Sequence, residues 1–100
     1  MTDSPPPDAE VTPWFLYVVR CGDDSLYTGI TTDVGRRVGE HNAGPKGARY
    51  TRARRPVTLA RSWGFADRSA AGKAEYALKA LSRGQKLAVI AGREVPPWRG

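Results

Sequence analysis

The sequence predicts an α/β fold, with a small, three-stranded, mainly antiparallel sheet flanked by about three helices. Residues 14–20, 26–32 and 57–65 are rich in the aromatic and β-branched side chains that favour strands. Three other segments carry helix caps or apolar residues at helical spacing. The 100 residues are enough for one domain with a modest core.

The first two strands are predicted to form a hairpin. The segment between them, Cys21–Ser25, holds a glycine and two aspartates, which suit a tight turn. Because side chains alternate along a strand, Tyr17 and Val19 share one face, and Tyr27 and Gly29 share one on the second strand. Gly29 has no side chain and is expected to leave a hollow beside Tyr27. The residue opposite Tyr17 depends on the register, which the sequence leaves open.

A helix follows the hairpin. Asp33 is the expected N-cap, and Asn42 or Gly44 the expected end. The stripe predicted to face the sheet is Val34, Arg37, Val38 and His41. An arginine on an inward stripe needs a partner, because an unpaired buried charge is costly. A bound phosphate would be such a partner, and so would Glu40 or Asp33.

Residues 44–56 are predicted to form a basic loop, because glycines and a proline near its ends disfavour a long helix. Tyr50 lies among its basic residues. Either it stacks on a base or sugar while its neighbours hold phosphates, or it anchors the loop to the core. A third strand over residues 57–65 follows, in which Trp63 and Phe65 are expected to pack.

Two further helices are predicted from their caps. Asp67 or Ser69 caps a helix that runs to about residue 81, and Ser82 with Gln85 matches a capping box that opens another, over about residues 83–92. The apolar stripe of the first is Ala71, Ala74, Leu78 and Leu81. The second buries Leu87, Val89 or Ile90.

Composition and charge narrow the function. The chain carries a net charge of +6, and three of its ten acidic residues lie in the first thirteen, which raises the charge of the remainder to +9. No acidic residue occurs between His41 and Ala66, a span with six basic ones, and such a field favours nucleic acid as partner. Residues 1–12 are predicted to be a disordered proline-rich tail, residues 13–92 the domain, and residues 93–100 an irregular tail.

The same sequence features exclude several protein classes. A single cysteine cannot form an internal disulfide, and with one histidine it cannot build a zinc site. No long apolar run and no signal-peptide pattern occur, so we expect a cytoplasmic protein without a membrane partner.

The spacing of four residues carries a family resemblance. Tyr17 in LYV, Tyr27 in YTG, Arg37 ten residues after Tyr27 and His41 four residues later resemble the signature of the GIY-YIG endonuclease superfamily. The run YTGITTDVGRRVGEHNAG is similar to its small stand-alone YhbQ-like branch. The resemblance extends from about residue 13 to residue 92. The chain departs from the family pattern at Ile30, where some relatives have lysine, and in lacking an asparagine on the last helix.

The resemblance implies an endonuclease that hydrolyses DNA with Mg²⁺ or Mn²⁺, and a catalytic set of Tyr17, Tyr27, Arg37, His41 and Glu75. Either tyrosine could be the general base, although a tyrosine that titrates near ~10 would need help from Arg37 or the metal. Arg37 would hold the scissile phosphate, and His41 would assist proton transfer or contact a phosphate. The expected nucleic-acid contacts are Gly29, Lys46, Arg49, Tyr50, Arg52, Arg54 and Arg55.

Glu75 has two interpretations. Its spacing from Lys79 favours an i, i+4 ion pair on a solvated helix face. The resemblance instead assigns it the role of the single metal ligand, which suits a cation that prefers oxygen ligands and keeps several waters.

Two other functions remain open on the sequence. The first is a weak or inactive nucleic-acid-binding module on the same scaffold, and the second is a domain whose basic loop binds an acidic protein. For the nuclease, DNA is favoured over RNA. The small size favours recognition of DNA structure over long sequence motifs, as in repair or recombination.

Overall fold

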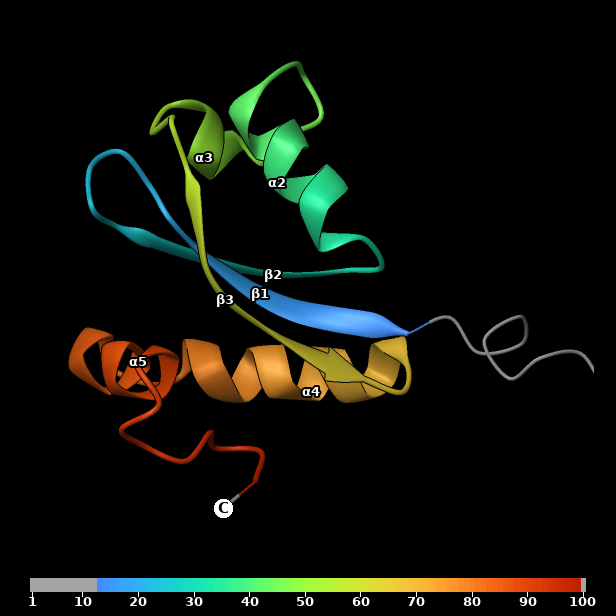
Figure 1. Cartoon of the computed structure of the whole chain (residues 1–100), viewed down its shortest axis with the longest axis vertical. Helices are drawn as coiled ribbons and strands as arrows, with labels where there is room; N and C mark the ends of the chain where they lie inside the picture. The colour runs from blue at the N-terminus through green and yellow to red at the C-terminus, as the bar shows by residue number, and fades with distance from the viewer. Residues whose placement is uncertain (1–12, 100) are drawn as a thin grey trace, which may run out of the picture.

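The computed structural model describes residues 13–99, in which a three-stranded sheet lies between two layers of helices (Figure 1). The strands are β1 (Trp14–Arg20), β2 (Leu26–Thr31) and β3 (Thr58–Phe65). Their order is β2-β1-β3 and both pairings are antiparallel, which confirms the predicted fold class. The tail predicted for residues 1–12 lies outside the described residues.

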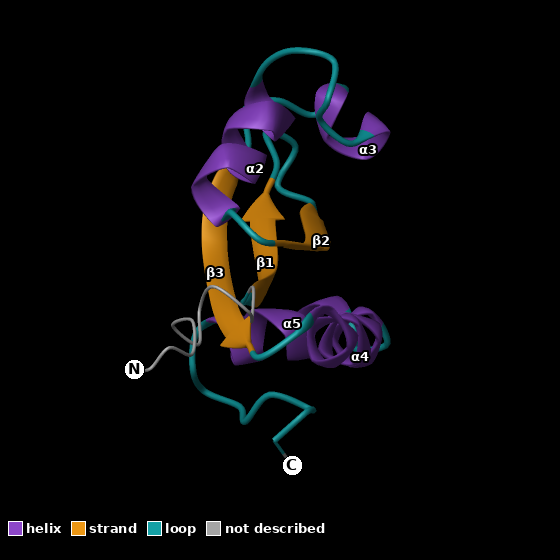
Figure 2. Cartoon of the chain, turned by 90° about the vertical axis from the view of Figure 1, so that its right-hand side faces the viewer, coloured by secondary structure: helices purple, strands orange, loops and turns teal. Residues whose placement is uncertain are grey.

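The helices divide between the two faces of the sheet. On one side lie α2 (Val34–Asn42) and α3 (Arg49–Arg52), and on the other α4 (Arg68–Lys79) and α5 (Arg83–Ile90) (Figure 2). None of these helices is long and apolar enough to span a membrane.

The predicted helix caps are present. The side chain of Asp33 accepts a hydrogen bond from the Arg36 amide, Asp67 accepts one from the Ala70 amide, and Ser82 forms the reciprocal capping box with its partner at the third helical position. Helix α4 ends at Lys79, two residues before the expected end. At its other end, the N-cap of α4 is Asp67 rather than Ser69, because the Asp67 side chain accepts the hydrogen bond.

Helix α3 corrects the sequence prediction, which assigned residues 44–56 to a loop alone. It is a single turn, in which the Arg52 amide donates to the Ala48 carbonyl at 3.0 Å. The flanking glycines and proline limit its length without preventing one turn. The buried side chain of Thr51 fixes this turn against the rest of the domain.

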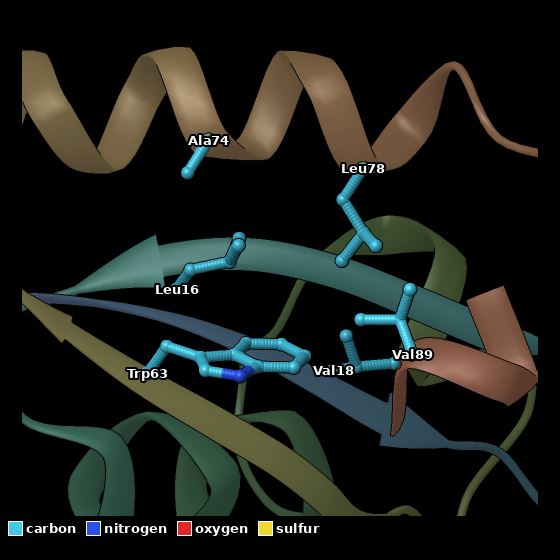
Figure 3. Packing of buried hydrophobic residues seen from close by; sticks show 6 residues of the cluster. All are labelled: Leu16, Val18, Trp63, Ala74, Leu78 and Val89. Carbon is cyan, nitrogen blue, oxygen red and sulfur yellow. The ribbon is translucent and has the colours of Figure 1, made fainter. Parts of the chain in front are cut away.

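Strand β1 contributes buried side chains to both faces of the sheet. Leu16 and Val18 point toward α4 and α5, where the core cluster also contains Trp63, Ala74, Leu78 and Val89 (Figure 3). Tyr17 and Val19 belong to a second cluster that packs against α2. Burying aliphatic side chains of this size contributes roughly 1.5–3 kcal/mol each.

The register of the hairpin places Tyr17 opposite Gly29 and Val19 opposite Tyr27. The turn closes with a hydrogen bond of 2.8 Å from the Cys21 amide to the Ser25 carbonyl. The two tyrosines are therefore diagonal neighbours rather than directly opposed, a relation that the sequence left open.

Residues 91–99, which follow α5, pack on the domain although they form no helix or strand. The ring of Trp98 meets those of Trp63 and Phe65 edge-on, with centroid distances of 5.1 and 5.6 Å. These contacts extend the apolar core toward the end of β3.

Candidate active site

The side chain of His41 lies at the centre of the candidate site and is completely buried. Its Nε2 is 2.7 Å from the hydroxyl oxygen of Tyr17. Its Nδ1 is 2.8 Å from Oγ1 of Thr51 and 3.3 Å from the amide nitrogen of Ala48. A buried ring with both nitrogens engaged does not touch a bound phosphate, so its chemistry passes through Tyr17.

Two proton arrangements are compatible with the hydrogen bond between Tyr17 and His41. In the first, the Ala48 amide donates to Nδ1 of His41, and Nε2–H donates to the oxygen of Tyr17. In the second, the Tyr17 hydroxyl donates to Nε2, Nδ1–H donates to Thr51, and the Thr51 hydroxyl donates to the Ala48 carbonyl at 2.9 Å. Tyr17 is thus an acceptor in the first arrangement and a donor in the second, in which Nδ1–H can no longer accept the hydrogen bond of the Ala48 amide.

Gly29 makes room for Tyr17. A Cβ on Gly29 would lie 2.6 Å from the hydroxyl oxygen of Tyr17 and 2.8 Å from the ring carbon that carries it. The hollow expected beside Tyr27 is therefore filled by the ring of Tyr17, which is only 1% exposed. The missing side chain therefore serves the packing of a tyrosine.

Tyr27 joins the buried site to the basic loop. Its ring meets that of His41 edge-on at 5.2 Å between centroids, and stacks on Tyr50 at 5.9 Å with an interplanar angle of 28°. The guanidinium carbon of Arg54 lies 3.8 Å from the centroid of the Tyr50 ring. Of the two roles considered for Tyr50, anchoring the loop is the one that these contacts support.

Arg37 lies close enough to Tyr17 to influence the pKa of its hydroxyl. Its Nη1 donates to Oε1 of Glu40 at 3.0 Å and to the Lys46 carbonyl at 2.7 Å. Glu40 is therefore the partner that the inward arginine requires, whereas Asp33 pairs with Arg36. The Arg37 side chain remains one-quarter exposed, so a phosphate oxygen can still reach it.

Burial and charge set the proton affinities. Burial raises the pKa of Tyr17 to about 12, against the lowering effect of a hydrogen bond from Arg37, and the carboxylate of Glu75 raises it slightly. Burial also lowers the pKa of His41 below its ordinary value of 6.5, and the charge of Arg37 lowers it further. Near neutral pH the site therefore holds a protonated tyrosine against a neutral histidine.

Glu75 lies on α4, and its carboxylate is close enough to Tyr17 to influence the pKa of that hydroxyl. It forms the i, i+4 ion pair with Lys79 that the helix spacing predicts, at 3.1 Å, and its side chain is 24% exposed. Within residues 13–99, no three histidine, cysteine or carboxylate side chains gather to hold a metal ion. A cation here would take one carboxylate oxygen from the protein and the rest from water or substrate, a donor set that suits Mg²⁺ or Mn²⁺.

The basic residues of the loop fall into two groups. Lys46, Arg49 and Arg52 are exposed, and no ion pair within the described chain involves them. Arg54 pairs with Asp23 at 3.0 Å, and Arg55 donates to the carbonyls of His41 and Gly44 at 2.7 and 2.8 Å. The first group is available to a polyanion, whereas Arg54 and Arg55 fasten the loop to the domain.

Sequence reasoning missed two residues that position the site. Thr51 is fully buried and holds His41, but nothing in the surrounding arginine-rich sequence indicates that this threonine is buried. Asn42, expected only as a helix end, bonds both the amide and the carbonyl of Val57 at 2.6 and 2.9 Å. The one available signal was an uncharged polar residue at each position within a strongly basic segment.

Comparison with known proteins places the chain in a family. Residues 13–88 match the model of the GIY-YIG catalytic domain. The UPF0213 protein DP2720 of Desulfotalea psychrophila is 50% identical over 88 residues, which cover 88% of this chain and 80% of that protein. The UPF0213 protein YhbQ of Escherichia coli is 51% identical over 81 residues, or 81% and 80% of the two chains. The solution NMR structure of the UPF0213 protein BH0048 from Bacillus halodurans, 42% identical, aligns with a TM-score of 0.53 and covers 84% of this chain and 88% of that one.

Proposed function

The chain belongs to the GIY-YIG family of nucleases, and from that premise we propose that it is a metal-dependent endonuclease that hydrolyses phosphodiester bonds in DNA. One observation carries the proposal. The hydroxyl of Tyr17, in the first motif of the family signature, is held at 2.7 Å by a buried neutral histidine. Arg37 and Tyr27, from the rest of the signature, lie beside it.

Tyr17 is the better candidate for the general base, because it alone of the two tyrosines has a proton acceptor behind it. The attacking water loses a proton to the oxygen of Tyr17, while Tyr17 passes its own proton to Nε2 of His41. A tyrosinate is not formed first, since burial holds the pKa of Tyr17 near 12. The two transfers therefore occur together with the attack on phosphorus.

Arg37 and Tyr27 act on the phosphate. The new bond joins the water oxygen to phosphorus, and the bond from phosphorus to the leaving strand oxygen breaks. Charge grows on the non-bridging oxygens during this exchange, and a guanidinium beside them stabilises it. The hydroxyl of Tyr27 makes no hydrogen bond within residues 13–99, which leaves it available to a phosphate oxygen.

Glu75 would hold the divalent cation, and Lys79 pairs with only one of its two oxygens, Oε2. A cation bound there supplies positive charge at the phosphate and at the leaving oxygen. The exposed Lys46, Arg49 and Arg52 would bind flanking phosphates. With so little surface for base readout, the enzyme would select DNA by structure, as repair or recombination requires.

Cleavage of labelled single-stranded, duplex and branched DNA tests the proposal, with Mg²⁺, with Mn²⁺ and with chelator. We expect metal-dependent nicking that Glu75→Ala abolishes and Tyr17→Phe greatly reduces. Tyr76→Phe is a matched control, because Tyr76 adjoins Glu75 but is 81% exposed.

The same assay separates the alternative function. The Glu75–Lys79 ion pair engages the one carboxylate that the metal needs, which favours a binding module without cleavage. Salt-sensitive DNA binding that is unchanged in Glu75→Ala, with no nicking by the wild type under any metal condition, would replace the nuclease by that module.

A further inference from the structure

A second basic site lies on the opposite face of the sheet from Tyr17. An open cavity of about 310 Å³ is lined by the middle of β3, the end of α5 and the irregular segment that follows it. Three arginines line it, Arg61, Arg93 and Arg99, together with a single carboxylate, Glu94. Three arginines against one carboxylate give the cavity a net positive charge, and no ion pair within residues 13–99 joins Glu94 to any of them.

The cavity has a structured wall. The Nη1 atom of Arg61 donates to the Ile90 carbonyl at 3.0 Å, and its guanidinium carbon lies 5.4 Å from the centroid of the Trp63 ring. Trp63 is itself 8% exposed and is held by the edge of Trp98. One arginine is thus fixed at the wall while Arg93 and Arg99 come from an exposed segment.

From this cavity we propose a second ligand site that binds a phosphate monoester of nucleotide size, either a free nucleotide or the phosphorylated end of a strand. A guanidinium group can donate two parallel hydrogen bonds to the oxygens of one phosphate. Three guanidinium groups around one cavity therefore favour a dianionic phosphate over a singly charged carboxylate. The volume is too large for phosphate alone and lies at the lower end of small-ligand pockets. The carboxylate of Glu94 disfavours a ligand that carries a second negative group beside its phosphate.

The site is independent of the proposed nuclease chemistry. Tyr17 points to the α2 side of the sheet, whereas Trp63 belongs to the cluster on the α4 side. Arg93, Glu94 and Arg99 also lie beyond residue 88, where the match to the GIY-YIG catalytic domain ends. Binding here therefore needs neither the metal nor cleavage.

Tryptophan fluorescence tests the proposal, because Trp63 lines the cavity and Trp98 contacts the ring of Trp63. The full chain is titrated in chelator with adenosine 5′-monophosphate, adenosine and inorganic phosphate, and with one short single strand bearing a 5′-phosphate or a 5′-hydroxyl. We expect saturable binding of the monophosphate, and weaker binding of adenosine and of phosphate by about tenfold or more. Preference for the phosphorylated strand over the free nucleotide would identify a strand end as the ligand, and the reverse would identify the nucleotide.

The double variant Arg93→Gln/Arg99→Gln should weaken this binding by about tenfold or more. Its matched control, Lys73→Gln/Lys86→Gln, removes the same charge from α4 and α5 and should change it by less than about twofold. The indole N–H resonance of Trp63 should move on binding and that of Trp14 should not, which also reports that each variant is folded.

Three results would overturn the second site. These are no saturable binding of either monophosphate ligand, equal losses in the two double variants, or movement of the Trp14 resonance alone. None of them bears on metal-dependent nicking, so the nuclease proposal and the second site can fail separately.

Discussion

The two faces of the sheet use the same strand for opposite purposes. On the α4 side, Leu16 and Val18 belong to a buried cluster of apolar side chains. On the α2 side, Tyr17 alternates with them and is buried just as deeply, but it contacts His41 and, through it, Thr51. The comparison separates burial that stabilises the fold from burial that fixes a chemical group.

The physical difference lies in what each face loses when one atom is removed. An apolar cluster loses contacts and leaves a cavity, which lowers stability in proportion to its volume. A hydrogen-bonded buried cluster loses a partner and leaves a polar atom unsatisfied. Neighbouring residues on β1 should therefore respond to substitution in different measurements.

The largest effect is expected from Tyr17→Phe. Removing the hydroxyl should lower the nicking rate by about 100- to 10,000-fold, because the proton acceptor for the attacking water is lost. It should lower the free energy of unfolding by only about 1–3 kcal/mol, since Nε2 of His41 loses its partner. Nicking assays measure the loss of rate, and urea denaturation measures the loss of stability.

Tyr50→Phe is the control for that prediction, because it removes a hydroxyl from the same aromatic cluster without touching His41. Equal losses of nicking in both variants would contradict the special role of Tyr17.

Leu16→Ala should show the reverse pattern. We expect a loss of about 2–5 kcal/mol in the free energy of unfolding, with the nicking rate per folded molecule nearly unchanged. Leu59→Ala, at a residue 42% exposed, should stay within about 0.5 kcal/mol. A nicking rate that collapses in folded Leu16→Ala would show that the two faces are not separable.

Gly29→Ala should affect both measurements, because the new Cβ meets the hydroxyl of Tyr17. We expect a destabilisation of about 1–3 kcal/mol together with reduced nicking as the ring is displaced. Gly39→Ala on α2 is the matched control, since a Cβ there meets nothing within 4 Å, and it should stabilise by about 0.4–1 kcal/mol. A Gly29→Ala protein with normal stability and rate would refute the packing argument.

The pH dependence should reflect His41, the only histidine of the chain. Its folded pKa lies below 6.5, so the unfolded chain binds a proton that the folded chain excludes. The free energy of unfolding should therefore fall as the pH drops below 6.5, until the folded pKa is reached. An NMR titration of the imidazole measures that pKa directly, and a value at or above 6.5 would contradict the burial of a neutral ring.

The smallest effect is expected from Lys79→Ala. An exposed i, i+4 ion pair contributes about 0–1 kcal/mol, so the free energy of unfolding should change little. Freeing Glu75 should leave metal-dependent nicking intact or raise it, measured as the Mg²⁺ concentration that gives half-maximal rate. A rate abolished as in Glu75→Ala would assign Lys79 its own part in the site.

Much of the fold was predictable because it follows from local chemistry. The β-branched strands, the caps at Asp33 and Ser82 and the stripe on α4 all lie where the sequence places them. Helix α3 was not predictable, because a single turn has no periodicity to read and depends on the burial of Thr51.

The sequence by itself determined which residues share a face, since alternation along β1 puts Tyr17 and Leu16 on opposite sides whatever follows. It also determined the signature of tyrosines, arginine and histidine that marks the family. Only the tertiary structure decided that Tyr17 lies opposite Gly29, that its hydroxyl meets His41, and that Arg54 and Arg55 bind the domain itself. The reason is that register and hydrogen-bond partners depend on segments far apart in the chain, whose meeting no local pattern encodes.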